Sequence, residues 1–80
     1  MAIPKDFEID VVSDVRFEEL LVEVSYRGQR LFQLNREMGP NAVEIEFLSD
    51  LRIISEEVEM KFALSDFVAV LKLAKNVLLE

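Results

Sequence analysis

Acidic side chains spaced two apart are the residues of this sequence whose type and position could support chemistry. Glu8 and Asp10 form one such pair, and Glu44 and Glu46 form another. On a strand, side chains two positions apart share a face, so each pair would hold its carboxylates close together. Such a pair can bind Ca²⁺ or act in general acid–base catalysis. Neither pair lies in a glycine-bearing loop of the Ca²⁺-binding kind, so we interpret both as a solvated sheet face or a surface for a cationic partner.

Other catalytic groups are missing from the composition. The 80 residues include no His and no Cys, which removes the commonest general base, the commonest zinc ligand and any thiolate nucleophile. The serines therefore have no base to activate them, and Gly28 and Gly39 stand alone rather than in a phosphate-binding motif. We predict a protein that is not an enzyme and has no catalytic residue, metal site or cofactor.

The charge balance restricts the class of partner. Sixteen acidic residues against nine basic ones give a net charge of −7. Such a chain repels phosphates, so we expect neither nucleic acid nor an anionic membrane as a partner. No apolar run is long enough to span a bilayer, the first residues do not resemble a signal peptide, and the absence of Cys fits a reducing compartment. These features predict a cytoplasmic protein.

Segments of the chain up to Phe62 alternate apolar and polar residues with the period of strands. We predict strands over 7–11, 20–26, 30–34, 43–47 and 58–62. The segment 48–57 is ambiguous, because it fits either a loop folded over the sheet edge or part of a longer fifth strand. Met38-Gly39-Pro40-Asn41 is the strongest break in the pattern and ends the third strand.

The turn at Arg27-Gly28 predicts a hairpin whose register follows from parity. A two-residue loop would pair Val24 with Leu31 and would place Gln33 on the buried face. A three-residue loop, Tyr26-Arg27-Gly28, pairs Val22 with Phe32 and Leu20 with Leu34, and it puts Gly28 in a left-handed conformation. We therefore expect the three-residue loop, with Tyr26 at the end of the sheet.

The period changes to that of a helix near Ser65. Ser65 is the predicted N-cap, and the helix runs from Asp66 to about Leu78 with a broad apolar face. Strands followed by one helix predict an α+β fold, in which an antiparallel meander of four to five strands has one C-terminal helix packed across one face. Residues 1–80 form a single domain. The predicted core is Phe7, Ile9, Val22, Val24, Phe32, Leu34, Val43, Ile45, Phe47, Met60, Phe62, Phe67, Val70, Leu71, Ala74 and Leu78.

The opposite side of the predicted sheet carries the candidate partner-binding residues. Six of them are acids that alternation turns outward, with only Lys61 available to offset them, and two are leucines that would form an apolar spot rimmed by those acids. The candidate surface consists of Glu8, Asp10, Leu21, Glu23, Leu31, Glu44, Glu46 and Glu59. The leucines and the broad helix face together predict a homodimer.

A segment of the chain resembles a known kind of bacterial protein. The residues are Val24-Ser25-Tyr26-Arg27-Gly28-Gln29-Arg30-Leu31, the acidic strand 43–47, and the closing segment 62–71. In this order they resemble small meander-plus-helix proteins, several of which are similar to immunity proteins of toxin systems. The resemblance implies an inhibitory binding protein and carries over no individual site residue.

Two classes of function remain. The first is a small, acidic, non-catalytic binding protein, an immunity-type inhibitor whose acidic face meets a basic protein partner. The second is a self-associating structural domain without such a partner. The salt dependence of association distinguishes them, because only the first depends on attraction between unlike charges.

Overall fold

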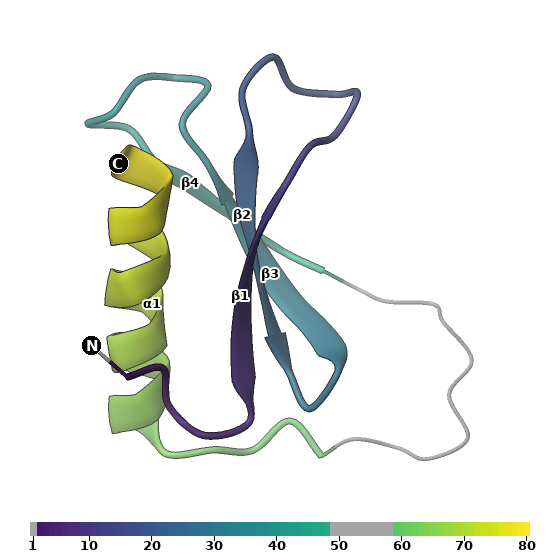
Figure 1. Ribbon diagram of the computed structural model, residues 1–80, viewed down its shortest axis with the longest axis vertical. Coiled ribbons are helices and arrows are strands. Elements are labelled where there is room, and N and C mark those ends of the chain that lie inside the picture. Colours follow the sequence, from purple (N-terminus) through teal and green to yellow (C-terminus); the bar gives the residue numbers. More distant parts are fainter. Residues whose placement is uncertain (1, 49–58) are drawn as a thin grey trace.

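A computed structural model describes residues 2–48 and 59–80 of the chain (Figure 1). Its elements are β1 (Phe7–Val12), β2 (Leu21–Tyr26), β3 (Gln29–Asn35), β4 (Glu44–Phe47) and α1 (Leu64–Leu79). The strands form one antiparallel sheet in the order β1-β2-β3-β4, and α1 packs on one face of that sheet. The predicted α+β meander with one C-terminal helix is confirmed.

Alternation divides the sheet into two faces. Ile9, Val24, Phe32 and Phe47 align across the four strands on the side of α1, which we call the helix-side face. Asp10, Glu23, Gln33 and Glu46 form the matching row on the opposite side, which we call the open face. Because the side-chain period of a strand is two, the register of each pair fixes which residues the helix can cover.

The β2–β3 hairpin has a different register from the predicted one. Arg27 and Gly28 form a two-residue turn with φ angles of 51° and 81°, and Tyr26 pairs with Gln29. A register shift next to Val24 then brings Val24 opposite Phe32 and Val22 opposite Leu34. The left-handed Gly28 is confirmed, whereas the three-residue loop, the pairs Val22–Phe32 and Leu20–Leu34, and a loop position for Tyr26 are wrong. Parity fixes the face of each residue, but it does not locate the extra residue of a bulge.

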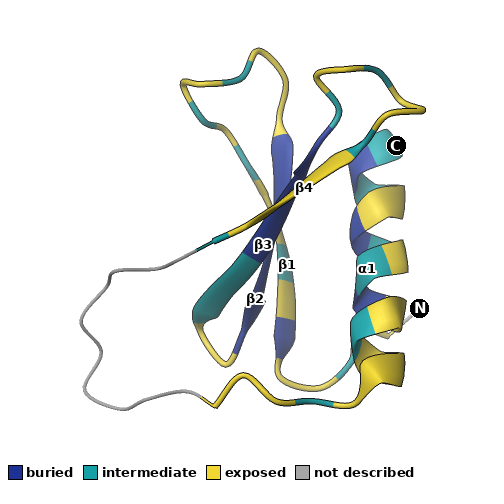
Figure 2. Cartoon of the chain, turned by 180° about the vertical axis from the view of Figure 1, so that it is seen from behind, coloured by how far each residue is buried: buried dark blue, intermediate teal, exposed yellow. Residues whose placement is uncertain are grey.

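The helix begins two residues earlier than its sequence signal. Its N-cap is Ala63, which makes no side-chain capping hydrogen bond, and Ser65 lies inside the first turn. The predicted Ser65 cap is therefore wrong. The helix buries Val70, Ala74 and Leu78 against the sheet, and its contacts reach β1, β2 and β3. Figure 2 shows this buried stripe facing the dark blue stretches of β2 and β3, while β4 is drawn as exposed.

Aromatic rings close the core at the end where α1 begins. The ring centroid of Phe7 lies 4.9 Å from that of Tyr26 and 5.1 Å from that of Phe62. The Phe67 ring stacks on Phe62 at 5.9 Å and meets Phe32 edge-on at 5.6 Å. These contacts hold the segment that enters α1 against the sheet, because tilted and edge-on ring pairs add to the gain from burial.

Three predicted core residues are exposed instead. Ile45 is 43%, Phe47 68% and Met60 42% exposed. Neighbouring strands are about 4.8 Å apart and a helix with its side chains is about 10 Å wide, so one helix covers two to three strands and leaves the fourth open. The predicted fifth strand is also wrong over 59–62, which carry no strand, while Val58 and residues 49–57 lie outside the described residues.

Candidate protein-binding surface

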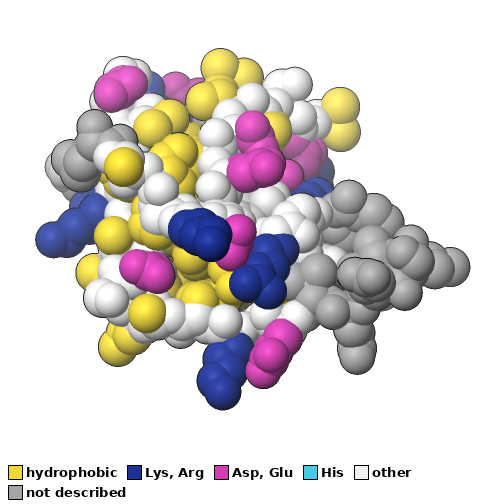
Figure 3. Space-filling view, turned by 60° about the horizontal axis from the view of Figure 1, so that its bottom comes forward, with side chains coloured by type: hydrophobic (Ala, Val, Ile, Leu, Met, Phe, Trp, Pro, Cys, Tyr) yellow, Lys and Arg dark blue, Asp and Glu magenta, His cyan; other side chains and the backbone are white. Residues whose placement is uncertain are grey.

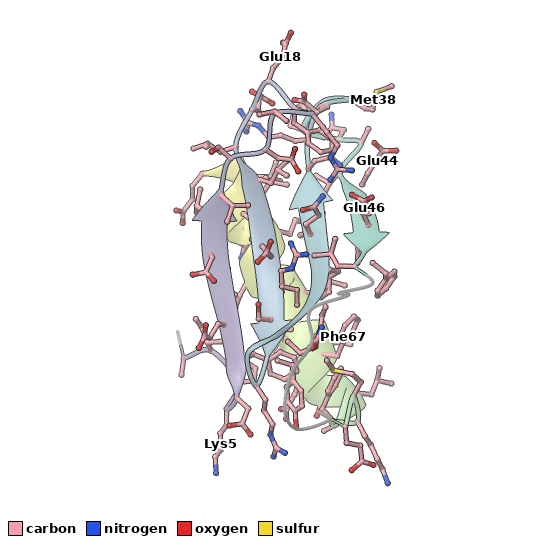
Figure 4. The ribbon with its side chains drawn as sticks, turned by 90° about the vertical axis from the view of Figure 1, so that its right-hand side faces the viewer. Lys5, Glu18, Met38, Glu44, Glu46 and Phe67 are labelled. Carbon is pink, nitrogen blue, oxygen red and sulfur yellow. The ribbon has the colours of Figure 1, made fainter. Side chains whose placement is uncertain are left out.

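Five of the predicted acids share the open face. Asp10, Glu23 and Glu46 lie in the row that crosses the sheet, where Gln33 takes the position on β3. Glu8 sits opposite Ser25, and Glu44 sits opposite Asn35. Figure 4 looks onto this face with α1 behind the sheet, and Glu44 and Glu46 line the margin at β4. The alternation of the sequence therefore places these carboxylates correctly.

The other predicted site residues do not join that face as expected. Glu59 is exposed but belongs to no strand, and its negative charge acts on Arg27 at the far end of the β2–β3 hairpin. Leu21 is fully buried, at 0% exposure, whereas the neighbouring Leu20 is 58% exposed. Leu31 is half-buried and packs against the core. The predicted exposed spot of Leu21 and Leu31 is therefore wrong, because one leucine is fully buried and the other is partly covered.

Arginines neutralise part of the open face. Arg30 Nη1 lies 3.4 Å from Glu23 Oε2, and Arg16 Nη2 lies 3.4 Å from Glu46 Oε1. The buried Gln33 donates from Nε2 to Glu46 Oε1 at 2.7 Å, so it satisfies its own amide and orients that carboxylate. The sequence suggested Lys61 as the counter-charge of this face. The structure instead places Arg30 and Arg16 beside its acids.

Arg16 contacts Glu46 of β4 from the loop between β1 and β2. Residues 13–20 connect β1 to β2, and Arg16 N donates to Asp14 Oδ1 at 2.9 Å, which turns the chain. That bond, together with the Arg16 guanidinium, lowers the pKa of the Asp14 carboxyl. Periodicity could not predict the contact with Glu46, because a loop side chain has no face assigned by the strand period.

Two loops at the same end of the sheet are joined by polar contacts. Glu18 N donates to Glu37 Oε1 at 2.7 Å, and Arg36 Nε lies 3.3 Å from Glu19 Oε2. The β1–β2 loop is therefore fixed to the β3–β4 connection. At the opposite end of the sheet, Arg27 Nε lies 3.2 Å from Asp6 Oδ2. Figure 3 shows basic and acidic side chains interspersed among hydrophobic ones at that end. The charge at that end is mixed.

Three acids of the open face have no counter-ion among the described residues. Within residues 2–48 and 59–80, Glu8, Asp10 and Glu44 form no ion pair, and all three are exposed. Glu8 and Asp10 lie on β1 and Glu44 lies on β4, so the unneutralised charge is concentrated at the two edges of the open face. This arrangement can attract a cationic surface over a distance comparable with the Debye length.

An apolar groove lies on the other side of β4. It has a volume of about 490 Å³ and runs between β4 and α1. Its lining includes Leu34, Ile45, Leu71 and Leu79, and Lys75 adds a positive charge. Such a lining accepts apolar side chains of a ligand or a protein. Periodicity did not predict this groove, because it assigned Ile45 and Phe47 to the core.

Over 2–48 and 59–80, no three His, Cys, Asp or Glu side chains gather closely enough to hold a metal ion. No helix in the same residues is both long and apolar enough to traverse a bilayer.

Comparison of the chain with models of known protein families, with curated proteins and with solved structures finds no match in any of the three. The similarity to immunity proteins of toxin systems therefore stays a prediction from the sequence, and the surface has to be interpreted from its own chemistry.

Proposed function

We propose that this chain is a non-catalytic protein-binding domain of the immunity type, which acts in the cytoplasm and inhibits a basic protein partner by covering it. The observation that carries the proposal is a set of exposed carboxylates, Glu8, Asp10 and Glu44. Within residues 2–48 and 59–80 they have no counter-ion, and no helix covers their face of the sheet. A net charge of −7 adds a long-range field of the same sign.

The physical argument concerns association rate more than affinity. Unpaired carboxylates on an exposed face steer a basic partner during diffusion, and salt weakens this steering. Glu23 and Glu46 contribute less, because Arg30 and Arg16 already lie beside them. The proposal therefore assigns the leading electrostatic role to three of the predicted acids.

The test is kinetic and uses charge-matched variants. The partner is first isolated from the native host with the wild-type chain as bait, and its association rate is then measured at increasing salt. The variant Glu8→Gln, Asp10→Asn, Glu44→Gln removes three charges from the face. The variant Glu18→Gln, Asp66→Asn, Glu80→Gln removes the same number elsewhere.

We expect a basic partner, an association rate that falls with salt, and a several-fold slower rate for the face variant than for its charge-matched control. Equal rates for the two variants would show that the net charge, and not this face, attracts the partner. A rate independent of salt would contradict the proposal altogether.

A second candidate function is self-association as a homodimer. Its original support from Leu21 and Leu31 is lost, but Ile45 and Phe47 remain exposed apolar side chains on the helix-side face of β4. Burying such a patch favours association. Light scattering across a dilution series tests this function, and a monomer mass at every concentration contradicts it.

A further inference from the structure

The outer edge of β4 offers unpaired backbone groups. Leu48 N donates to Leu31 O at 2.8 Å, in the same register as the pairs Glu46–Gln33 and Glu44–Asn35. Antiparallel pairs alternate between hydrogen-bonded and non-bonded positions, so Glu44 and Glu46 direct their N–H and C=O groups toward β3. The N–H and C=O groups of Ile45 and Phe47 therefore point away from the sheet. In the described part of the chain, no strand pairs with this edge.

The two faces of β4 carry side chains of different chemistry. Glu44 and Glu46 stand on the open face, and Ile45 and Phe47 stand on the helix-side face. All four are exposed. A strand added here would meet carboxylates on one side and apolar side chains on the other, at alternating positions.

The other sheet edge offers this combination only near its end, where Val11 is 56% exposed. On β1, Phe7 is 6% exposed, and Ile9 packs against the core beside α1. Phe7 N is also occupied, because it donates to Pro4 O at 3.2 Å. An added strand would therefore bury less new apolar surface at β1 than at β4.

Charge disfavours a second copy of β4 as the natural occupant of its own edge. Two-fold antiparallel pairing must bring residues of the same face opposite each other. Pairing centred on Ile45 sets Glu44 against the Glu46 of the second copy, and pairing centred on Glu46 sets that residue against its own counterpart. Like charges directly opposite destabilise a sheet, whereas Lys or Arg at those positions stabilises it.

We propose that the outer edge of β4 accepts an extended segment of the basic partner as an added strand. The segment has Lys or Arg at alternate positions opposite Glu44 and Glu46, and apolar residues between them that cover Ile45, Phe47 and the adjoining groove. Main-chain hydrogen bonds supply affinity in such strand addition, and the alternating side chains supply specificity. This inference rests on the proposed function and specifies how the partner is held.

Synthetic peptides test the proposal directly. The probe is an eight-residue capped peptide of alternating Lys and Val. Two control peptides change the sequence: one has the same composition in the order Lys-Lys-Val-Val, and the other alternates Glu and Val. Two further controls keep the Lys-Val sequence and carry N-methyl groups on alternate backbone nitrogens, one peptide for each of its two edges. Binding is followed by amide chemical shifts and by hydrogen exchange at Ile45 and Phe47.

We expect the alternating Lys-Val peptide to protect the amides of Ile45 and Phe47 about tenfold or more from exchange, while the amides of β1 stay unchanged. The shuffled and acidic peptides should bind at least about tenfold more weakly. Methylation should abolish binding on one peptide edge and not on the other. Equal binding of the alternating and shuffled peptides, protection at β1 instead of β4, or equal tolerance of methylation on both edges would overturn the proposal.

A substitution at the edge completes the test. Phe47→Pro removes an outward N–H without breaking a bond to β3, and proline is tolerated at that kind of position on an edge strand. Phe47→Ala is its control, because it removes the ring and keeps the N–H. We expect Phe47→Pro to weaken peptide binding more than Phe47→Ala does. If Phe47→Pro fails to fold, the methylated peptides still decide the question.

The outcome also separates this inference from the proposed function. If the isolated partner dissociates equally fast from wild type, Phe47→Pro and Phe47→Ala while the face variant still slows its association, edge pairing is wrong and the proposed function stands. A doubled mass that is lost in Phe47→Pro would assign the edge to a second copy and overturn the proposal.

Discussion

The two edge strands of this sheet share a pattern and differ in their surroundings. β1 begins with Phe-Glu-Ile-Asp, and the sequence of β4 is Glu-Ile-Glu-Phe. Both segments place acids on the open face and apolar residues on the helix-side face. Phe7 is nevertheless 6% exposed and Phe47 is 68% exposed. The comparison teaches that alternation assigns a face to each residue, while the position of the helix determines whether that face is covered.

The contacts of the two phenylalanines explain the difference. Phe7 lies within 5.1 Å of both the Tyr26 and Phe62 rings, measured between centroids, beside the segment that leads into α1. The Phe47 ring meets Phe32 edge-on at 6.1 Å. Since α1 contacts β1, β2 and β3, the apolar side of β1 stabilises the fold, whereas that of β4 is available for association.

The largest expected effect comes from truncating the buried ring of this pair. Phe7→Ala should lower the free energy of unfolding by about 3–5 kcal/mol, because it leaves a cavity between two rings. That loss is comparable with the whole stability of a small domain, and urea denaturation measures it. A loss below about 1 kcal/mol would show that β1 is as open as β4.

A change at the central hairpin should affect both edges together. Gly28 has a φ of 81° with open space around its missing Cβ, so Gly28→Val introduces backbone strain and no clash. We expect a loss of about 1–3 kcal/mol, and a smaller one for Gly28→Asn, which tolerates this conformation better. Hydrogen exchange should show faster opening at β1 and β4 alike. Faster exchange at one edge alone would contradict the expectation that both edge strands depend on this hairpin.

The matched substitution on the exposed edge should have a smaller effect on stability. Phe47→Ala removes a ring that is mostly in water, so the expected loss is about 1 kcal/mol or less. The same urea experiment measures it beside Phe7→Ala. Equal losses of stability for the two phenylalanines would contradict the difference between the edges, because they would show that Phe47 is covered in solution.

The smallest expected effect concerns the loop that ties β4 to the other strands. The Arg16 N–H and guanidinium beside Asp14 hold the pKa of that carboxyl below its usual range. A lowered pKa in the folded chain means that this contact stabilises above the unfolded pKa and is lost as the pH falls through the folded value. Carboxyl chemical shifts should therefore place the Asp14 pKa below that of a free aspartate.

A pair of variants sharpens this test. Arg16→Ala should raise the Asp14 pKa part of the way back, because the backbone N–H of residue 16 remains. Arg36→Ala, whose guanidinium pairs with Glu19 instead, should leave the pKa unchanged. An unshifted Asp14 in the wild type would remove the evidence that this turn directs Arg16 toward Glu46.

The candidate site was predictable in part. Alternation alone placed Glu8, Asp10, Glu23, Glu44 and Glu46 on one face, because the side-chain period of a strand is a local property. It could not show that Arg16 and Arg30 neutralise Glu46 and Glu23, because those contacts join a loop to a strand and one strand to the next. It also could not show that Leu21 is fully buried and Leu31 partly covered.

The sequence by itself determined the order of elements, the two faces of the sheet and the left-handed turn at Gly28, since each follows from local periodicity and local sterics. Only the tertiary structure decided which apolar residues are buried. Ile9 and Ile45 each lie between two acidic residues in the sequence. Ile9 nevertheless packs against the core, whereas Ile45 lines an open groove. The reason is geometric, because a single helix is narrower than a four-stranded sheet and its placement leaves β4 uncovered.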